Sequence, residues 1–270
     1  MNFWKNLRRI FFPKKCIICT DPIPYEEKVP ICDDCIEAWD DQIHMECHTC
    51  GAMAKDCNCI PKELRSVSSF ACWSVFYTGN MEPPSPDMII YYLKKFNSWQ
   101  VYDFCAEMMV KSIRSQCAKH NENYKEYVVT YSPRSPQKYY KIGVDQSEEL
   151  AKEISKKLGI PFVKSLENVG SKEQKKLNRE QRIKNAQTSY RLHKNFESKN
   201  YKYFLVDDVL TTGATLYHCA ELLLKSGAQA VVPVTYCKDN IKKGDIKNAK
   251  RNIKYYFTRI VKGTMRNGTQ

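Results

Sequence analysis

The chain has 270 residues, 43% of them apolar, which suffices for one sizeable core and excludes wholesale disorder. Lysine and arginine outnumber aspartate and glutamate by 43 to 30, giving a formal charge of +13. This excess favours polyanionic partners such as nucleic acid or phosphorylated ligands, although many basic proteins bind neither. No window has the apolar length of a signal peptide or a membrane span, so we expect a cytoplasmic protein with reduced thiols and no membrane span.

Eight of the 13 cysteines lie within residues 16–59, as three Cys-x2-Cys pairs and a final Cys-x-Cys pair. In a reducing compartment such pairs are typical of metal ligands, and four thiolates provide the tetrahedral set that structural zinc prefers. We therefore expect two zinc ions in two zinc ribbons. The predicted ligands are Cys16, Cys19, Cys32 and Cys35 for the first ion and Cys47, Cys50, Cys57 and Cys59 for the second.

The cysteine cluster also leaves alternatives open. Sequential pairing is favoured, but a cross-braced pairing would use the same eight cysteines differently. An iron–sulfur cluster is the alternative to zinc, since thiolates bind both. His44 and His48 lie among the cysteines, but a complete set of thiolates leaves them unnecessary as ligands.

Composition divides the chain into two predicted domains. Residues 1–63 are cysteine-dense and lack long-range periodicity, as expected of a small zinc-ribbon domain held by metal. Residues 64–270 are predicted to form an α/β domain, because from Tyr127 onward strand patterns alternate with helix patterns, which implies a parallel sheet flanked by helices. We expect strands within 66–79 and at 127–131, 201–208, 228–237 and the start of 254–270, helices at 88–117, 144–159 and 214–227, and a loop at 132–143.

Residues 204–215, FLVDDVLTTGAT, hold the most specific site signal. An apolar run places Asp207 and Asp208 at the carboxyl end of a parallel strand, where open α/β sheets bind ligands. The next residues, Thr211, Thr212, Gly213, Ala214 and Thr215, lead into a helix whose first amide groups are free to hold a phosphate. Carboxylates accept hydrogen bonds from vicinal hydroxyls, so the stretch predicts a ligand with a ribose and a 5′-phosphate.

The same stretch resembles the phosphoribosyl-pyrophosphate signature of type I phosphoribosyltransferases. That resemblance implies that Asp207 and Asp208 bind the ribose hydroxyls and that residues 211–215 bind the 5′-phosphate. Mg²⁺ is expected with the ligand, because a diphosphate beside carboxylates needs a hard cation. Arg134, which follows the strand at 127–131, is placed to reach the diphosphate.

Together with the cysteine pairs, residues 131–154 and 172–187 resemble the ComF family, phosphoribosyltransferase-like proteins associated with natural competence and DNA uptake. Many members carry an Arg-Gly-Phe-Asn-Gln run before the first core helix. Here Ile142, Gly143, Val144, Asp145 and Gln146 stand in its place, so the arginine, phenylalanine and asparagine of the run are replaced while its glycine and glutamine remain.

Two further basic regions can each be interpreted as a functional site or as an ordinary structural feature. Segment 172–184 could close over a diphosphate or line a strand-binding surface with Lys175, Lys176, Arg179 and Arg182, or form a solvated charged face. The pairs Tyr139/Tyr140 and Tyr91/Tyr92 lie near lysines and could stack the bases of single-stranded DNA, or divide between core and surface.

The favoured hypothesis is a ComF-like protein that binds phosphoribosyl pyrophosphate and acts in DNA uptake, with single-stranded DNA or a competence helicase as partner. The alternative is an active phosphoribosyltransferase in nucleotide salvage. No residue identifies an acceptor base or a catalytic group.

Overall fold

The computed structural model describes residues 11, 13–27, 29–80, 84–95, 97–170, 189–194, 196 and 200–241. The basic segment 172–184 and the strand expected at the start of 254–270 lie outside these residues. None of the helices in this part of the chain has the length and apolarity that crossing a bilayer requires.

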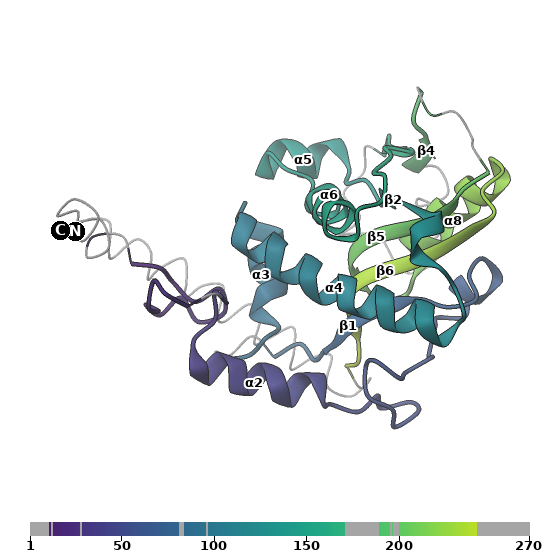
Figure 1. Ribbon diagram of the computed structural model, residues 1–270. Helices are drawn as coiled ribbons and strands as arrows, with labels where there is room; N and C mark the ends of the chain where they lie inside the picture. The colour runs from purple at the N-terminus through teal and green to yellow at the C-terminus, as the bar shows by residue number, and fades with distance from the viewer. Residues whose placement is uncertain are drawn as a thin grey trace.

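A four-stranded parallel sheet forms the centre of the molecule, in the order β1-β6-β5-β2 (Figure 1). Its strands are almost wholly buried, as expected of a parallel sheet covered on both faces. Phe162 pairs with Val129 and extends the β2 edge. The strands are β1 (Cys72–Tyr77), β2 (Tyr127–Tyr131), β5 (Lys202–Leu210) and β6 (Ala230–Asp239).

Helices cover both faces of this sheet. One face packs against α4 (Trp99–Lys119) and α6 (Gln146–Leu158), with α3 (Met88–Lys95) beside α4 (Figure 1). The other face packs against α8 (Ala214–Lys225). The bounds of α6 follow from local chemistry, because the Asp145 carboxylate accepts from the first amides and Gly159 ends the helix at φ +64°.

Several elements differ from the sequence-based prediction. The loop expected at 132–143 is wrong in its second half, where Pro136–Ile142 forms α5 with proline in the first turn. The sequence also gave no prediction of α2 (Asp33–Ile43) or of the antiparallel ribbon made by β3 (Leu166–Asn168) and β4 (Tyr190–Leu192). Two short 3₁₀ turns, at Leu64–Ser66 and Tyr124–Glu126, complete the described elements.

The cysteine-rich region is joined to the sheet through a buried polar cluster around Asp87, which is 1% exposed. Gln42 of α2 donates from Nε2 to Asp87 Oδ1 at 2.8 Å. The backbone N–H and hydroxyl of Thr78 and the N–H of Asn80 donate to Oδ2 at 2.9, 2.8 and 3.0 Å. One carboxylate therefore links α2, the end of β1 and the start of α3.

Asp87→Ala is expected to lower the free energy of unfolding by about 3 kcal/mol or more, because each buried donor left without an acceptor costs about 1–3 kcal/mol. Urea unfolding followed by circular dichroism measures the change. Asp87→Asn, which keeps one acceptor oxygen, should lower the free energy of unfolding clearly less than Asp87→Ala does. Equal losses in the two variants would show that the hydrogen bonds to Asp87 contribute little.

Candidate functional site

The two acids of β5 lie where the neighbouring strand stops. β2 pairs with β5 only as far as Val206, whereas β6 continues in register from Asp207 to Leu210. Asp207 and Asp208 therefore lie at the carboxyl end of the sheet, as predicted, beyond the last pair of β2 with β5, although β5 itself runs two residues beyond Asp208. We call this end of the sheet, around the two acids and Arg134, the crevice.

Asp207 is held from two sides. The Ser147 hydroxyl, in the first turn of α6, donates to its Oδ1 at 3.0 Å, and the backbone N–H of Asp208 donates to the same oxygen at 2.9 Å. Burial and, second, the charge of Asp208 raise the pKa of Asp207 to about 7. This carboxyl therefore exchanges its proton near neutral pH.

Asp208 faces two cations. Its Oδ2 lies 3.6 Å from a guanidinium nitrogen of Arg134 and 3.5 Å from Lys94 Nζ. The side chains of Asp208 and Arg134 are each 14% exposed, so this pair is largely shielded from water. The structure thus brings Arg134 to the acids, as expected, and adds Lys94 of α3, which no sequence motif indicated.

The position of Arg134 is fixed by its backbone. Its N–H donates to Asp145 Oδ2 at 2.7 Å, while Asp145 Oδ1 accepts from the amides of the α6 cap. On the other side, Asn168 of β3 donates from Nδ2 to the Pro133 carbonyl at 3.2 Å. Asp145, which departs from the ComF-type run, therefore anchors the arginine loop.

The threonine loop joins β5 to α8. Thr211 and Thr212 are exposed, and the Ala214 N–H lies 3.4 Å from Thr212 Oγ1 at the start of the helix. Gly213 has φ +77° and is buried against Leu64, so close that an added Cβ would lie 2.9 Å from Leu64 Cδ1. The loop needs glycine for both reasons, and it presents the positive end of α8 beside the acids.

Tyr190 is a residue of this region that the sequence did not indicate. It is buried at the start of β4, where its hydroxyl lies near the side chains of Thr215 and Ser132. Burial, followed by the charges of Cys219 and Asp207, raises its pKa. Tyr190 thus connects the threonine loop to the loop that carries Arg134.

Two groups of four cysteines lie at the N-terminal side of the fold. In each group the four Sγ atoms lie within 4.8 Å of one another, a spacing that fits one metal ion with four thiolates. The cysteines come together in the sequential order that was favoured, and neither His44 nor His48 belongs to a group. The groups, which could each hold zinc, are Cys16, Cys19, Cys32, Cys35 and Cys47, Cys50, Cys57, Cys59.

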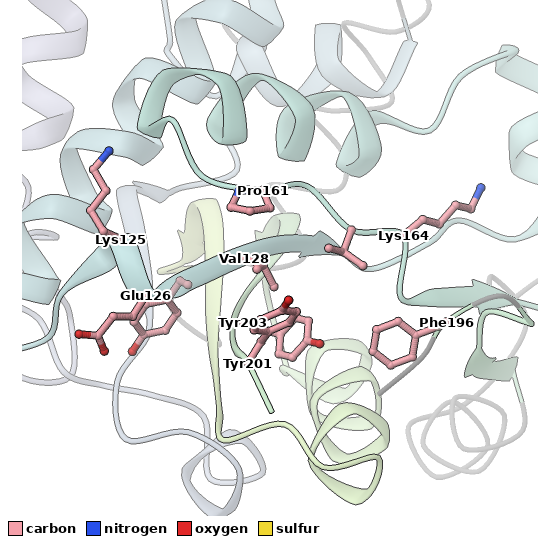
Figure 2. A pocket seen from close by; sticks show the side chains of 10 residues that line it. Lys125, Glu126, Val128, Pro161, Lys164, Phe196, Tyr201 and Tyr203 are labelled. Carbon is pink, nitrogen blue, oxygen red and sulfur yellow. The ribbon is translucent and has the colours of Figure 1, made fainter. Parts of the chain in front are cut away.

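Two pockets open along the β2 edge of the sheet. One, of about 350 Å³, is lined by Arg134 and by Tyr139 and Tyr140 of α5. The other, of about 420 Å³, lies toward the amino ends of β2 and β5, where Tyr201 and Tyr203 flank it (Figure 2). Both pockets contain Lys164, so they adjoin.

The exposure of the two tyrosine pairs differs. Tyr139 and Tyr140 are 46% and 83% exposed, as stacking on a base would require. Tyr91 is 7% exposed and packs in the core, whereas Tyr92 is half-buried beside it, so this pair divides between core and surface and does not offer two rings for stacking.

Comparison with known proteins finds a similarity in the part of the chain that carries the two acids and the threonine loop. Residues 144–262 match the family model described as phosphoribosyl transferase domain. This part of the chain is therefore similar to the phosphoribosyl transferase domain, and the predicted fold class is confirmed: a type I phosphoribosyltransferase-like parallel sheet flanked by helices, with a small zinc-ribbon region at the N-terminus. No curated protein matches the sequence.

Similar solved structures share little sequence with the chain. Phosphoribosylpyrophosphate synthetase from Mycobacterium smegmatis is 16% identical over 54% of this chain and 40% of its own, with a TM-score of 0.32. Adenine phosphoribosyltransferase from Thermoanaerobacter pseudethanolicus is 18% identical over 52% and 78%, with a TM-score of 0.31. A hypoxanthine phosphoribosyltransferase from Staphylococcus aureus is 14% identical over 52% and 75%, with a TM-score of 0.33. The chain thus spans less than half of the synthetase.

Proposed function

We propose that the crevice around Asp207 and Asp208 binds phosphoribosyl pyrophosphate. The observation that carries the proposal is the placement of three chemically distinct groups at one edge of the sheet: two acids, Arg134 at 3.6 Å from Asp208, and the exposed threonine loop. Carboxylates accept from ribose hydroxyls, an arginine pairs with a diphosphate, and a loop at a helix start holds a terminal phosphate. Phosphoribosyl pyrophosphate carries all three partners.

Mg²⁺ fits this chemistry as a companion of the ligand. The oxygens available to it are those of the diphosphate, and hard oxygen donors are what Mg²⁺ prefers. Asp207 and Asp208 are left for the ribose hydroxyls. When bound, the ion would neutralise charge on the diphosphate. Arg134 and Lys94 already supply positive charge on the Asp208 side of the crevice.

The role we favour for the protein is that of a ComF-like protein that acts in DNA uptake and handles single-stranded DNA. Support comes from the formal charge of +13 and from the two adjoining pockets, which combine lysines with tyrosines. Lys125 and Lys164 lie toward opposite ends of the pocket in Figure 2, with Tyr201 between them. Aromatic rings and lysines in series are the pattern that binds single strands without sequence preference.

An active phosphoribosyltransferase in nucleotide salvage is the second candidate, and the Arg134 pocket favours it. This pocket joins the exposed rings of Tyr139 and Tyr140 to the polar groups of Glu148 and Asn168, a lining that suits a planar base. In such a reaction a base nitrogen forms a bond to the anomeric carbon as the bond to the diphosphate oxygen breaks, and diphosphate leaves with the electron pair.

One pair of assays separates the two roles. Release of diphosphate from phosphoribosyl pyrophosphate that depends on an added nucleobase would establish the transferase. Salt-sensitive binding of single-stranded oligonucleotides, weakened about tenfold by Tyr140→Ala or Tyr201→Ala, is expected for DNA handling, because each stacked base contributes about 1–3 kcal/mol. Tyr25→Ala, at a tyrosine that is as exposed as Tyr201 and lies outside both pockets, is the control. No binding near physiological salt would exclude direct DNA handling.

The affinity for phosphoribosyl pyrophosphate is expected to fall by up to about tenfold between pH 8 and pH 6. Because the pKa of Asp207 is raised to about 7, the carboxyl is ionised above that pH and keeps its proton below it, where it accepts ribose hydroxyls poorly. Titration calorimetry at several pH values measures the change. Inorganic phosphate, which lacks the ribose, corrects for ionisation of the phosphate itself, and an equal pH dependence for both ligands would contradict the assignment to Asp207.

A further inference from the structure

A buried lysine lies beside the second cysteine group. Lys238 of β6 is 8% exposed, and its Nζ lies 3.5 Å from Cys57 Sγ and 3.8 Å from Cys47 Sγ. The same Nζ lies 5.0 Å from the ring centroid of Trp73 and 5.5 Å from that of Phe76. A lysine comes to the second cysteine group from the central part of the sheet rather than from the cysteine-rich region itself.

The charges of the two partners match. An ammonium group buried among aromatic rings needs an anion, because desolvation of an isolated charge is costly. Four thiolates around one divalent cation carry a net negative charge, and N–H donors to the sulfurs reduce that charge without replacing a ligand. The Lys238 ammonium group is placed to supply a positive charge and N–H donors to two of the four sulfurs, those of Cys47 and Cys57.

The same site is connected to the threonine loop by two routes. Lys238 pairs in register with Leu210, the residue directly before Thr211. The chain that leaves Cys59 continues into the 3₁₀ turn that begins at Leu64, and Leu64 packs on Gly213. Both routes end at the residues that the proposed function assigns to the 5′-phosphate.

We propose that Lys238 is an outer-sphere group of the second metal centre, and that this centre supports the phosphate-binding loop, so that metal and ligand stabilise each other. Such coupling is reciprocal: a metal ion that orders the loop raises ligand affinity, and a bound ligand slows loss of the ion. The outer-sphere role stands on the Lys238 contacts alone, whereas the coupling rests on the proposed function.

The outer-sphere role is tested on the zinc-loaded full-length protein by transfer of zinc to a chromogenic chelator. Lys238→Met is expected to release one of the two ions about 10- to 100-fold faster and the other at the wild-type rate, while Lys238→Arg stays near wild type. Lys157→Met is the matched control, because Lys157 is 22% exposed and pairs with Asp103 and Glu107 instead of thiolates. Lys238→Gln, which keeps an N–H donor, replaces Lys238→Met if the latter does not fold. If Lys238→Met, or Lys238→Gln in its place, released both ions at the wild-type rate, the outer-sphere role of Lys238 would be overturned.

The coupling is tested on the wild-type protein with phosphoribosyl pyrophosphate and Mg²⁺. Saturating ligand is expected to slow release of the Lys238-sensitive ion at least threefold and to leave the other ion unchanged. Binding seen by calorimetry without any change in release would overturn the coupling. Absence of binding by calorimetry would instead count against the proposed function and equally remove the coupling, while the release rates of Lys238→Met would still decide the outer-sphere role.

Discussion

Phosphoribosyl pyrophosphate is expected to bind at least about 100-fold more weakly to the Asp207→Asn/Asp208→Asn variant than to the wild type, since each hydrogen bond to a charged group contributes about 1.5–3 kcal/mol. The double substitution removes two charged carboxylates that would accept hydrogen bonds from the ribose hydroxyls. Titration calorimetry in the presence of Mg²⁺ measures the affinity. Glu221→Gln, an acid on the adjacent helix α8 that pairs with Lys225, is the control for a change of charge alone.

Inorganic diphosphate, which lacks the ribose, shows whether the loss of affinity comes from the ribose hydroxyls or from the diphosphate. Removing the acids leaves Arg134 and Lys94 without the carboxylate that they now face, so diphosphate should bind the double variant as tightly as wild type or more tightly. Loss of affinity confined to the ribose-containing ligand therefore identifies the acids as hydroxyl acceptors. If phosphoribosyl pyrophosphate bound both proteins equally, the acids would not contact the ligand.

Removal of the metal ions is expected to lower the unfolding temperature by about 10 °C or more, because about 1 kcal/mol corresponds to roughly 2–4 °C in a chain of this size and structural zinc contributes several kcal/mol. Cys16 and Cys35 belong to the core on the α4 and α6 face, and Cys47 and Cys57 to the core on the α8 face. Thermal unfolding before and after chelation, with metal analysis of each sample, measures the effect.

Single substitutions divide the metal effect between the two centres. Cys57→Ala should lower the zinc content from two ions per chain to one, because it removes a ligand of the second group. Cys105→Ala, at a buried cysteine outside both groups, should leave the metal content unchanged. Fewer than two zinc ions per wild-type chain would contradict the prediction of two zinc sites. An unchanged unfolding temperature after chelation would show that the ions do not stabilise the fold.

Much of the α/β architecture could be predicted because the pattern there is local. The strands 127–131, 201–208 and 228–237 have apolar runs, and they correspond to β2, β5 and β6. Helix α5 was missed because two prolines within 132–143 favoured a loop, although Pro136 in the first turn and Gly143 at φ +80° are ordinary helix ends. The β3–β4 ribbon was missed because its strands are three residues long and pair across a long insertion.

The site divides in the same way. Asp207, Asp208 and the threonine loop could be found because all belong to one strand-to-helix connection. Arg134 could be placed because it follows another strand of the same sheet, and carboxyl ends of parallel strands meet at one edge. Lys94, Ser147 and Tyr190 reach the crevice from α3, α6 and β4, and no local pattern records which side chains meet across elements.

The pairing of cysteines was predictable from spacing, but their connection to the sheet was not. Lys238 lies in an apolar strand, where a lysine looks like an interruption, and only the fold brings it within 3.5 Å of Cys57. Likewise, contact between Leu64 and Gly213 joins residues about half a chain apart. Contacts of this kind depend on tertiary packing, which the sequence pattern of either segment does not contain.

Calorimetric titration of the zinc-loaded wild-type protein with phosphoribosyl pyrophosphate and Mg²⁺ tests the central claim most directly. We predict one binding site per chain, competition by ribose 5-phosphate and by diphosphate separately, and loss of the ribose-dependent affinity in Asp207→Asn/Asp208→Asn. No heat of binding at millimolar ligand, with both zinc ions in place and the protein folded, would contradict the assignment of this crevice to phosphoribosyl pyrophosphate.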